Sequence, residues 1–599
     1  MRSFVGSVSI AQCSKTHPAS VDGVPFSFLH GADGKSSDAH DKIITVPSRK
    51  GKFGAFGGLP IEEKEADRWL DDFSCRGHEY LLDIRKPVWS FVWDDERKEA
   101  VIAVDRFRIN WLYWLEHAGR IHFSPSIADL LQYLRISFDP DPNALFAYLD
   151  LLCVPAEMSM QRGMGKLGGG RCIVIKDGSA SVRRYHRFSF REKLKGDIDS
   201  LGKIIRAGIE RSVGERLSWV GDSKAGCFLS GGTDSSTLLG FSSRISGPGF
   251  PAFSVSFSED RWNELEYASL AAKTFDADHK IIPFSMEDAW RFSETLAKRF
   301  DEPLGNPSLL ATCKCVEEAS LAGVEYMIAG DGGDEIFGGN ERYASEYLYS
   351  RFNESVPGFL RKLCMKGAGY SASVLDFPLL GRAQRILERA DRKNPERYYL
   401  EDAFAYKIFP SAFRKEFAEA INPEICLEIF SNYYSEADAG DDLDRLLHID
   451  MYHTLGDNDL VKVGMAGRIN GVGILYPMLG DALVDDACRL PCWAKLKGRE
   501  KRHAFKVAMT GFVPEKILYK KKHGFGVPIS HWIRNSKPFS GRIAEVLFDG
   551  SGLVLKIVKQ EELKSIFRNH VENRIDAGMF LWGLYYLNIW HRNISTKIK

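Results

Sequence analysis

Two short stretches combine glycine with hydroxyl and carboxyl side chains in a pattern that suits phosphate chemistry. The first, LSGGTDSS, begins at Leu229 directly after a predicted apolar strand. Gly231 and Gly232 would let the backbone approach an anion, and the unpaired amides of the following helix, predicted to begin near Ser235, would point toward it. The hydroxyl donors of the stretch are Ser230, Thr233, Ser235 and Ser236. The pattern predicts a pyrophosphate-binding loop, although not of the Walker type, because no Gly-Lys-Ser/Thr follows.

Asp234 is unexpected in such a loop, because a carboxylate repels phosphate unless a metal ion lies between them. A second stretch, AGDGGDEIFGG, follows another predicted strand and contains three acids, Asp331, Asp334 and Glu335. The carboxyl ends of parallel strands meet at one edge of a sheet, so we expect Asp234 and Asp334 to lie together and bind Mg²⁺. The alternatives are a simple glycine turn with Asp234 as a helix cap, and an acidic turn exposed to water.

The elements that must position these residues alternate between strands and helices. Strands are predicted at 225–229, 249–257, 279–284 and 324–330, with a helix at 263–275. Ile205, Ile209, Val213 and Leu217 recur every four residues and predict an amphipathic helix before the first strand. This order predicts a parallel sheet wrapped by helices, followed from about residue 350 by a mainly helical part.

The first third of the chain has a different character, rich in strand signals such as VWSFVWDD (88–95) and RCIVIKDG (171–178). The charged, weakly apolar segment at 190–202 predicts a domain boundary, which divides the chain into residues 1–192 and 193–599. A chain of 599 residues is long enough for two or more domains.

The amino-acid composition limits the kinds of partner and compartment that the protein can have. Lys+Arg and Asp+Glu number 80 each, so no bulk field favours nucleic acid or an anionic membrane. The N-terminus lacks the apolar stretch of a signal peptide, and the most apolar segment, MFLWGLYYLNIW (579–590), is too short to span a bilayer. The eleven cysteines contain no CxxC pair, which argues against a zinc site and for a reducing compartment. We therefore predict a cytoplasmic protein with no nucleic-acid or membrane partner.

Taken together, the two stretches resemble the PP-loop synthetase domain of the class B asparagine synthetase superfamily. Further segments agree: NELEYA (263–268), DEPLGNPS (301–308), the lysine-containing segment 499–532 and LWGLYYLNIW (581–590). The resemblance covers roughly residues 201–590. It implies an α/β fold with a C-terminal PP-loop (adenine nucleotide α-hydrolase-like) parallel sheet and a helical extension. It also implies an N-terminal degenerate Ntn-type αββα glutaminase-like domain.

The resemblance implies that ATP is cleaved to AMP and pyrophosphate while a substrate carboxylate becomes an acyl-adenylate, which an amine then converts to an amide. Asp234 and Asp334 match the Mg²⁺ ligands. Lys522 matches a lysine that stabilises the adenylate and the tetrahedral intermediate, although on local sequence it is one solvated cation of a run of three. Asp331 stands where an acid can assist proton removal. The positions expected to bind ATP are Leu229, Ser230, Gly232, Thr233, Asp234, Ser235, Ser236, Val255, Ser256, Gly330 and Lys501.

The chain also departs from this family. Glutamine-using members place a nucleophilic cysteine at position 2, where this chain has Arg2, and a guanidinium is no nucleophile. Cys13 would serve only after unusual processing. DRFRINWLYW (105–114) and IHFSPSIADLL (121–131) still resemble the glutaminase lobe, so we expect a retained lobe without glutaminase activity. Gly473 and Leu475 replace an acid and an arginine, which predicts a larger, less charged acceptor than free aspartate.

These departures favour a lasso peptide cyclase. Such an enzyme adenylates an Asp or Glu side chain of a precursor peptide and closes a macrolactam with the N-terminal amine of that peptide. Its expected partners are the precursor peptide, a leader peptidase and a leader-binding protein. Four alternatives stay open: an ammonia-dependent asparagine synthetase, a β-lactam-synthetase-like small-molecule cyclase, a PP-loop tRNA modifier and an inactive scaffold. The β-lactam synthetases have a tyrosine at the position of Asp331, which disfavours that alternative.

Overall fold

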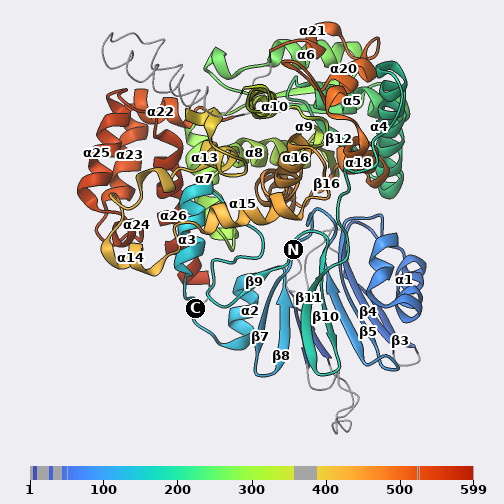
Figure 1. Ribbon diagram of the computed structural model, residues 1–599. Helices are drawn as coiled ribbons and strands as arrows, with labels where there is room; N and C mark the ends of the chain where they lie inside the picture. The colour runs from blue at the N-terminus through green and yellow to red at the C-terminus, as the bar shows by residue number, and fades with distance from the viewer. Residues whose placement is uncertain are drawn as a thin grey trace.

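The computed structural model describes residues 4–9, 26–30, 43–49, 52–356, 388–521, 524 and 526–597. The N-terminal part contains two antiparallel sheets that face each other, shown in blue to teal in the lower half of Figure 1. In spatial order, the first sheet contains β2 (Phe26–His30), β1 (Phe4–Ser9), β8 (Arg120–Ser124), β7 (Tyr113–His117) and β9 (Gly165–Lys166). The second contains β11 (Ser179–Arg184), β10 (Arg171–Lys176), β6 (Glu99–Ala103), β5 (Val88–Asp94), β4 (Lys52–Gly58) and β3 (Ile44–Arg49).

The alternation of side chains along β5 shows how the layers form. Trp89, Phe91 and Trp93 point into the core between the two sheets. Val88 and Val92 point to the opposite face, where α1 (Glu63–Arg76) covers the second sheet. Helix α2 (Ile127–Leu134) covers the outer face of the first sheet in the same way. The domain is therefore an αββα sandwich, which confirms the predicted fold of this lobe.

A third sheet has five strands, all parallel, in the order β14 (Asp278–Pro283), β13 (Pro251–Ser256), β12 (Ala225–Phe228), β15 (Tyr326–Ile328) and β16 (Gly473–Leu475). Its connecting helices are α4 (Ile198–Val220), α5 (Thr233–Ser246), α6 (Leu265–Thr274), α7 (Met286–Arg299) and α8 (Ser308–Leu321). Ile205, Ile209 and Val213 of α4 are completely buried. The predicted parallel sheet and its amphipathic leading helix are confirmed. The predicted domain division at residue 192 falls between β11 and α4.

The remaining chain is helical, as expected, and its helices lie on both sides of this sheet (Figure 1). Its longer helices are α10 (Glu341–Ser355), α15 (Ile425–Glu436), α16 (Asp442–Tyr452), α17 (Leu460–Asn470), α18 (Asp481–Arg489), α20 (His503–Met509), α22 (Ile529–Asn535), α23 (Lys537–Phe548), α25 (Gln560–Val571) and α26 (Gly578–Lys597). The apolar segment 579–590 lies in α26, where Leu581, Trp582 and Trp590 are buried. In the described part of the chain, no helix is both long and apolar enough to cross a bilayer.

Two buried ion pairs join the N-terminal lobe to the rest of the chain. Arg108 lies 2.5 Å from Asp457, which belongs to a π-helix at Thr454–Asp459. Lys166 lies 2.5 Å from Glu302, whose carboxylate also accepts a hydrogen bond from the Tyr113 hydroxyl at 3.1 Å. Buried charges such as these are costly unless paired, so the two lobes depend on each other for satisfied partners.

Candidate active site

A cavity of about 660 Å³ lies at the carboxyl ends of β12, β13 and β15. Both glycine-rich stretches line it. The C-terminal part contributes Lys501, Arg502, Lys506, Leu518, Lys520, Lys521 and Gly524. The expected site residues found on its wall are Leu229, Ser230, Gly232, Thr233, Asp234, Ser235, Val255, Gly330, Asp331, Asp334 and Lys501. The structure therefore brings these expected residues together around one cavity.

Two expected residues lie elsewhere, and a third falls outside the described residues. Ser236 is fully buried inside α5, because it sits on the face of the helix that packs into the core. The Ser256 hydroxyl donates to the Ile282 carbonyl at 3.4 Å on the neighbouring strand, and within the described chain Ser256 does not line the cavity. Lys522 lies outside the described residues, whereas its neighbours Lys520 and Lys521 line the cavity.

The first loop depends on the left-handed backbone of Gly231, with φ of 75°. A Cβ atom there would lie 2.7 Å from the Glu264 carbonyl oxygen, so only glycine allows the loop to pack against the start of α6. The chain then enters α5 at Thr233, two residues earlier than predicted, with Gly232 as its N-cap. Asp234 consequently lies in the first helical turn, close to the unpaired amides that favour anions.

The second stretch uses glycine to make room for the two acids. A Cβ atom on Gly333 would lie 2.5 Å from Oδ1 of Asp234, and one on Gly339 would lie 1.9 Å from Oδ1 of Asp334. Both carboxylates therefore pack against bare backbone. Because β12 and β15 are adjacent, the carboxylates of Asp234 and Asp334 approach each other closely. One guanidinium nitrogen contacts both of these carboxylates. Two carboxylates that converge on one cation fit the oxygen ligand set of Mg²⁺.

The cation between them is Arg502, which the sequence analysis did not single out. Its Nη1 donates to Asp234 Oδ2 at 2.7 Å, to Thr233 Oγ1 at 3.0 Å and to Asp334 Oδ1 at 3.3 Å. Its Nη2 donates to the other oxygen of Asp234. The sequence shows two adjacent cations, Lys501 and Arg502, but no local pattern indicates which of them contacts Asp234 and Asp334. Lys501 instead pairs with Glu341.

Asp331 faces the cavity from the same stretch and has a different environment. Burial raises its pKa from the ordinary value to about 6, against the opposing attraction of Lys462. Lys462 Nζ lies 3.8 Å from Asp331 and 2.6 Å from Asp459, and both of these partners line the cavity. Lys462 and Asp459 carried no signal in the sequence, because Asp459 ends a π-helix with no recognisable pattern and Lys462 lies just after it. A carboxyl group that titrates near neutrality suits proton transfer.

Glu335 differs from the other acids of this stretch. It is buried, and burial followed by repulsion from Asp334 raises its pKa well above the ordinary value. The raised pKa favours the neutral form of Glu335, which reduces the negative charge beside Asp234 and Asp334.

The segment NELEYA ties the nucleotide side of the cavity to the C-terminal signature. The Asn263 side chain accepts from the Phe257 amide at 2.8 Å and donates to its carbonyl, which fixes the chain beyond β13. Glu264 pairs with Lys520 at 2.6 Å. This ion pair holds Lys520 at the wall of the cavity.

One expectation about the acceptor side is not supported. Gly473 and Leu475 lie in β16, where both are buried, and neither lines the cavity in the described part of the chain. Their departure from the family pattern therefore acts within the sheet rather than on the cavity wall.

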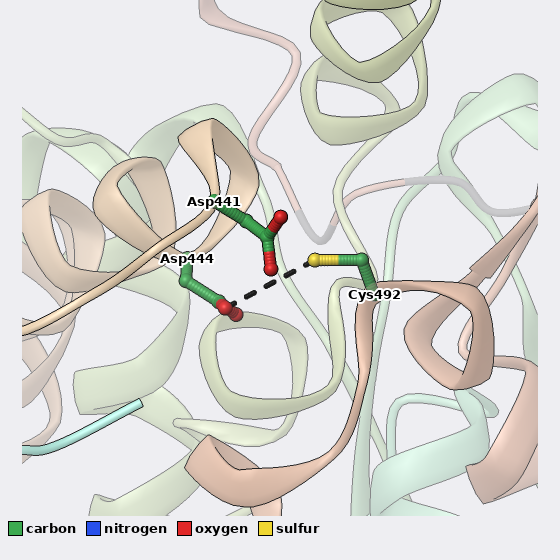
Figure 2. Close-up of side chains that lie close together, drawn as sticks. All are labelled: Asp441, Asp444 and Cys492. Carbon is green, nitrogen blue, oxygen red and sulfur yellow. Dashed lines mark hydrogen bonds between the residues drawn. The ribbon is translucent and has the colours of Figure 1, made fainter. Parts of the chain in front are cut away.

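A separate cluster of Asp441, Asp444 and Cys492 has ligand atoms close enough for a metal (Figure 2). Asp444 is already paired with Lys193 at 2.6 Å and with Lys495 at 2.7 Å. Burial raises the pKa of the Cys492 thiol to about 12, so it stays protonated. Two resident cations and a neutral thiol make this cluster an internal ion-pair network rather than a metal site.

Comparison with known proteins agrees with this geometry. The family described as Asparagine synthase matches residues 205–592, and the Glutamine amidotransferase domain matches residues 70–186. The chain is 25% identical over 511 residues to glutamine-hydrolyzing asparagine synthetase 1 of Bacillus subtilis, covering 84% of this chain and 77% of that protein. It is 26% identical over 546 residues to a putative glutamine-hydrolyzing asparagine synthetase of Mycobacterium tuberculosis, covering 89% and 80%. A solved structure of glutamine phosphoribosylpyrophosphate amidotransferase from B. subtilis aligns with a TM-score of 0.18 and 10% identity, over 42% of this chain and 59% of that one, which is too weak to support an argument.

Proposed function

The chain belongs to the asparagine synthase family, and from that premise we propose that it is a lasso peptide cyclase, which closes a macrolactam in a precursor peptide. Enzymes of this family are ATP-dependent carbon–nitrogen ligases that use Mg²⁺ and release AMP and diphosphate. The protein is accordingly an ATP-dependent carbon–nitrogen ligase. The proposal concerns its acyl donor and its amine.

The observation that carries the proposal is the state of the cysteines in the N-terminal lobe. Glutamine hydrolysis requires a reactive thiolate. Cys153 and Cys172 are buried, and burial raises the pKa of Cys172 to about 12 and that of Cys153 further. Cys75 lies exposed on α1, on the outer face of the sandwich. Within the described part of this lobe, no cysteine is placed to attack glutamine, which supports an amine that comes from another source.

In the proposed reaction, a peptide Asp or Glu carboxylate attacks the α-phosphorus of ATP, and the bond to pyrophosphate breaks. The loop at 230–235 receives the pyrophosphate, and Asp234 and Asp334 would hold Mg²⁺, which supplies positive charge to the phosphates. Lys522 steadies the developing negative charge. The N-terminal amine of the peptide then attacks the acyl carbon, the bond to AMP breaks, and Asp331 accepts the amine proton.

The cavity supports this assignment by its size and by the charged groups in its lining. Its volume of about 660 Å³ lies within the range of pockets that enclose whole ligands. The lining combines the acid pair Asp234 and Asp334 with a second charged group, Asp331 and Lys462. A peptide whose amine is held near its own activated carboxyl needs only correct positioning to react. A leader peptidase to free that amine and a leader-binding protein are the partners this proposal requires.

A second candidate is an asparagine synthetase, because the two relatives above are described as glutamine-hydrolyzing asparagine synthetases. Without a cysteine placed to attack glutamine in the described part of the lobe, this candidate would use ammonia. Purified enzyme should be given Mg·ATP with aspartate and ammonium, or with a leaderless precursor peptide encoded beside its gene. We expect the peptide to lose the mass of one water molecule and to become resistant to carboxypeptidase. One AMP should be released from ATP for each peptide cyclised. Asparagine production without peptide cyclisation would overturn the peptide proposal. Asp234→Asn should abolish ATP–pyrophosphate exchange in either case, whereas Asp441→Asn, in the separate acidic cluster, should leave it intact.

A further inference from the structure

We propose that Arg502 is the built-in counter-ion of the metal-binding acids, and that a divalent ion enters the site only by displacing it. This inference rests on the proposed function in taking Asp234 and Asp334 as metal ligands. The guanidinium contacts both oxygens of Asp234 and one oxygen of Asp334. These are the atoms that a divalent ion would need, so the two cations cannot share them.

The position of Arg502 is fixed from several sides. The residue is 7% exposed, and its guanidinium lies 4.0 Å from the centroid of the Phe505 ring. It also caps α20 with a left-handed backbone, at φ 59° and ψ 39°, a conformation that is costly for a residue with a side chain. Backbone strain of this kind persists where the surroundings over-determine it, which is common at functional sites. The strained residue and the acid pair therefore form one unit.

Charge balance gives this unit a purpose. Two carboxylates pressed against glycine backbone would repel each other if left alone, and an always-charged guanidinium relieves that repulsion. A free divalent ion would have to displace this guanidinium into a cavity that already contains Lys501, Lys506 and Lys520, which is electrostatically unfavourable. An ion that arrives with a triphosphate meets a smaller barrier, because the phosphates offer the released guanidinium new oxygen partners beside the loop at 230–235. The site is thus selective for a divalent cation carried by a nucleotide over the free ion.

The test is a titration with Mn²⁺ alone, without nucleotide, in which electron paramagnetic resonance measures the unbound ion. Arg502→Gln keeps hydrogen-bonding capacity and removes the charge, and we expect it to bind Mn²⁺ at least about tenfold more tightly than the wild type. Lys506→Gln is the matched control, because Lys506 is a cation of the same helix and cavity that pairs with Glu500 at 3.6 Å rather than with the acids. We expect it to change Mn²⁺ affinity by less than about threefold.

Two further variants keep the result interpretable. Arg502→Lys retains the charge but cannot contact two carboxylates in a fixed fork, so its Mn²⁺ affinity should fall between those of the wild type and the glutamine variant. It also serves if the glutamine variant fails to fold. Asp234→Asn in the Arg502→Gln background should abolish the gain. If Arg502→Gln does not bind Mn²⁺ more tightly than the wild type, although Asp234→Asn still weakens Mn²⁺ binding, Arg502 is not the competing ion. If Asp234→Asn has no effect on Mn²⁺ binding, the acids are not metal ligands, and the proposed metal site itself is wrong.

Discussion

Lys462 Nζ lies 2.6 Å from Asp459 and 3.8 Å from Asp331, so one ammonium group serves two carboxylates on the same cavity wall. Lys462 is closer to Asp459 than to Asp331, so its attraction to Asp331 is the weaker of the two. Burial therefore outweighs this attraction and raises the pKa of Asp331 to about 6. Asp331 can therefore be ionised at neutral pH and still accept a proton, as a base for the attacking amine must.

Replacement of Asp331, the proposed base, should separate the two half-reactions. Asp331→Asn should lower the rate of amide formation by about 10²- to 10⁴-fold, the usual contribution of a positioned base. ATP–pyrophosphate exchange, which does not require deprotonation of the amine, should fall by less than about tenfold. Single-turnover product analysis and isotope exchange on the same preparation measure the two steps. An equal loss in both would show that Asp331 acts on nucleotide binding instead.

Replacement of Lys462 should move the pH profile. Amide formation in the wild type should rise with pH and level off above about 6, as Asp331 loses its proton. Lys462 lowers the pKa of Asp331, so Lys462→Met should move the acidic limb of the kcat profile to higher pH. Arg162→Met, in an exposed ion pair of the N-terminal lobe, provides a charge-matched control. A limb that stays in place would mean that another group titrates.

The raised pKa of Asp331 also carries a cost in stability. Between the unfolded pKa near 3.8 and the folded pKa near 6, the native state binds more protons than the unfolded state, so the free energy of unfolding falls as pH rises through this window. Asp331→Asn removes this term and should stabilise the protein at pH 7 by on the order of 1–2 kcal/mol. Urea denaturation at pH 7 and at pH 4 measures it, and the gain should vanish at pH 4. A variant that is less stable than the wild type at pH 7 would contradict this account.

The sequence predicted the parts of this site that depend on short-range pattern. Glycine-rich turns after apolar strands carry their own signal, so Asp234 and Asp334 were expected to meet once the sheet was expected to be parallel. Arg502 and Lys462 were missed because each reaches the cavity through long-range packing of helices whose local sequence is ordinary. The helix start at Thr233 was missed for a local reason, since a cap without a hydroxyl or carboxylate side chain leaves no mark.

The glycines around the acids should tolerate no side chain. Gly339→Ala would place a methyl group 1.9 Å from Asp334 Oδ1 and 2.8 Å from Cδ of Arg502. Because neither neighbour can retreat without breaking the acid–arginine unit, we expect a loss of about 1–3 kcal/mol in the free energy of unfolding and loss of ATP–pyrophosphate exchange. Gly440→Ala is the control, since its new methyl group would meet open space. Similar effects of both substitutions would argue for a general intolerance of alanine rather than crowding at the acids.

The N-terminal lobe bears on this chemistry through Arg108. This residue pairs with Asp457 and also donates to the Gly456 carbonyl at 2.8 Å, so it grips the π-helix at two points. The same π-helix ends at Asp459, the closer partner of Lys462. A lobe without glutaminase activity would thus still be needed to hold the cavity wall that carries the acceptor chemistry.

Removal of Arg108 should therefore damage both stability and the second half-reaction. In Arg108→Met, Asp457 keeps the Ala156 amide at 2.9 Å but loses its buried counter-ion, which should cost about 3–5 kcal/mol in the free energy of unfolding. Arg162→Met should cost less than about 1 kcal/mol, because its pair with Asp139 is exposed. Adding Asp457→Asn to Arg108→Met should recover part of the loss, since no charge is then left buried. With Lys462 less firmly placed, amide formation should fall more than ATP–pyrophosphate exchange. If Arg108→Met is destabilised no more than Arg162→Met and keeps both activities, the lobe does not support the site through this pair.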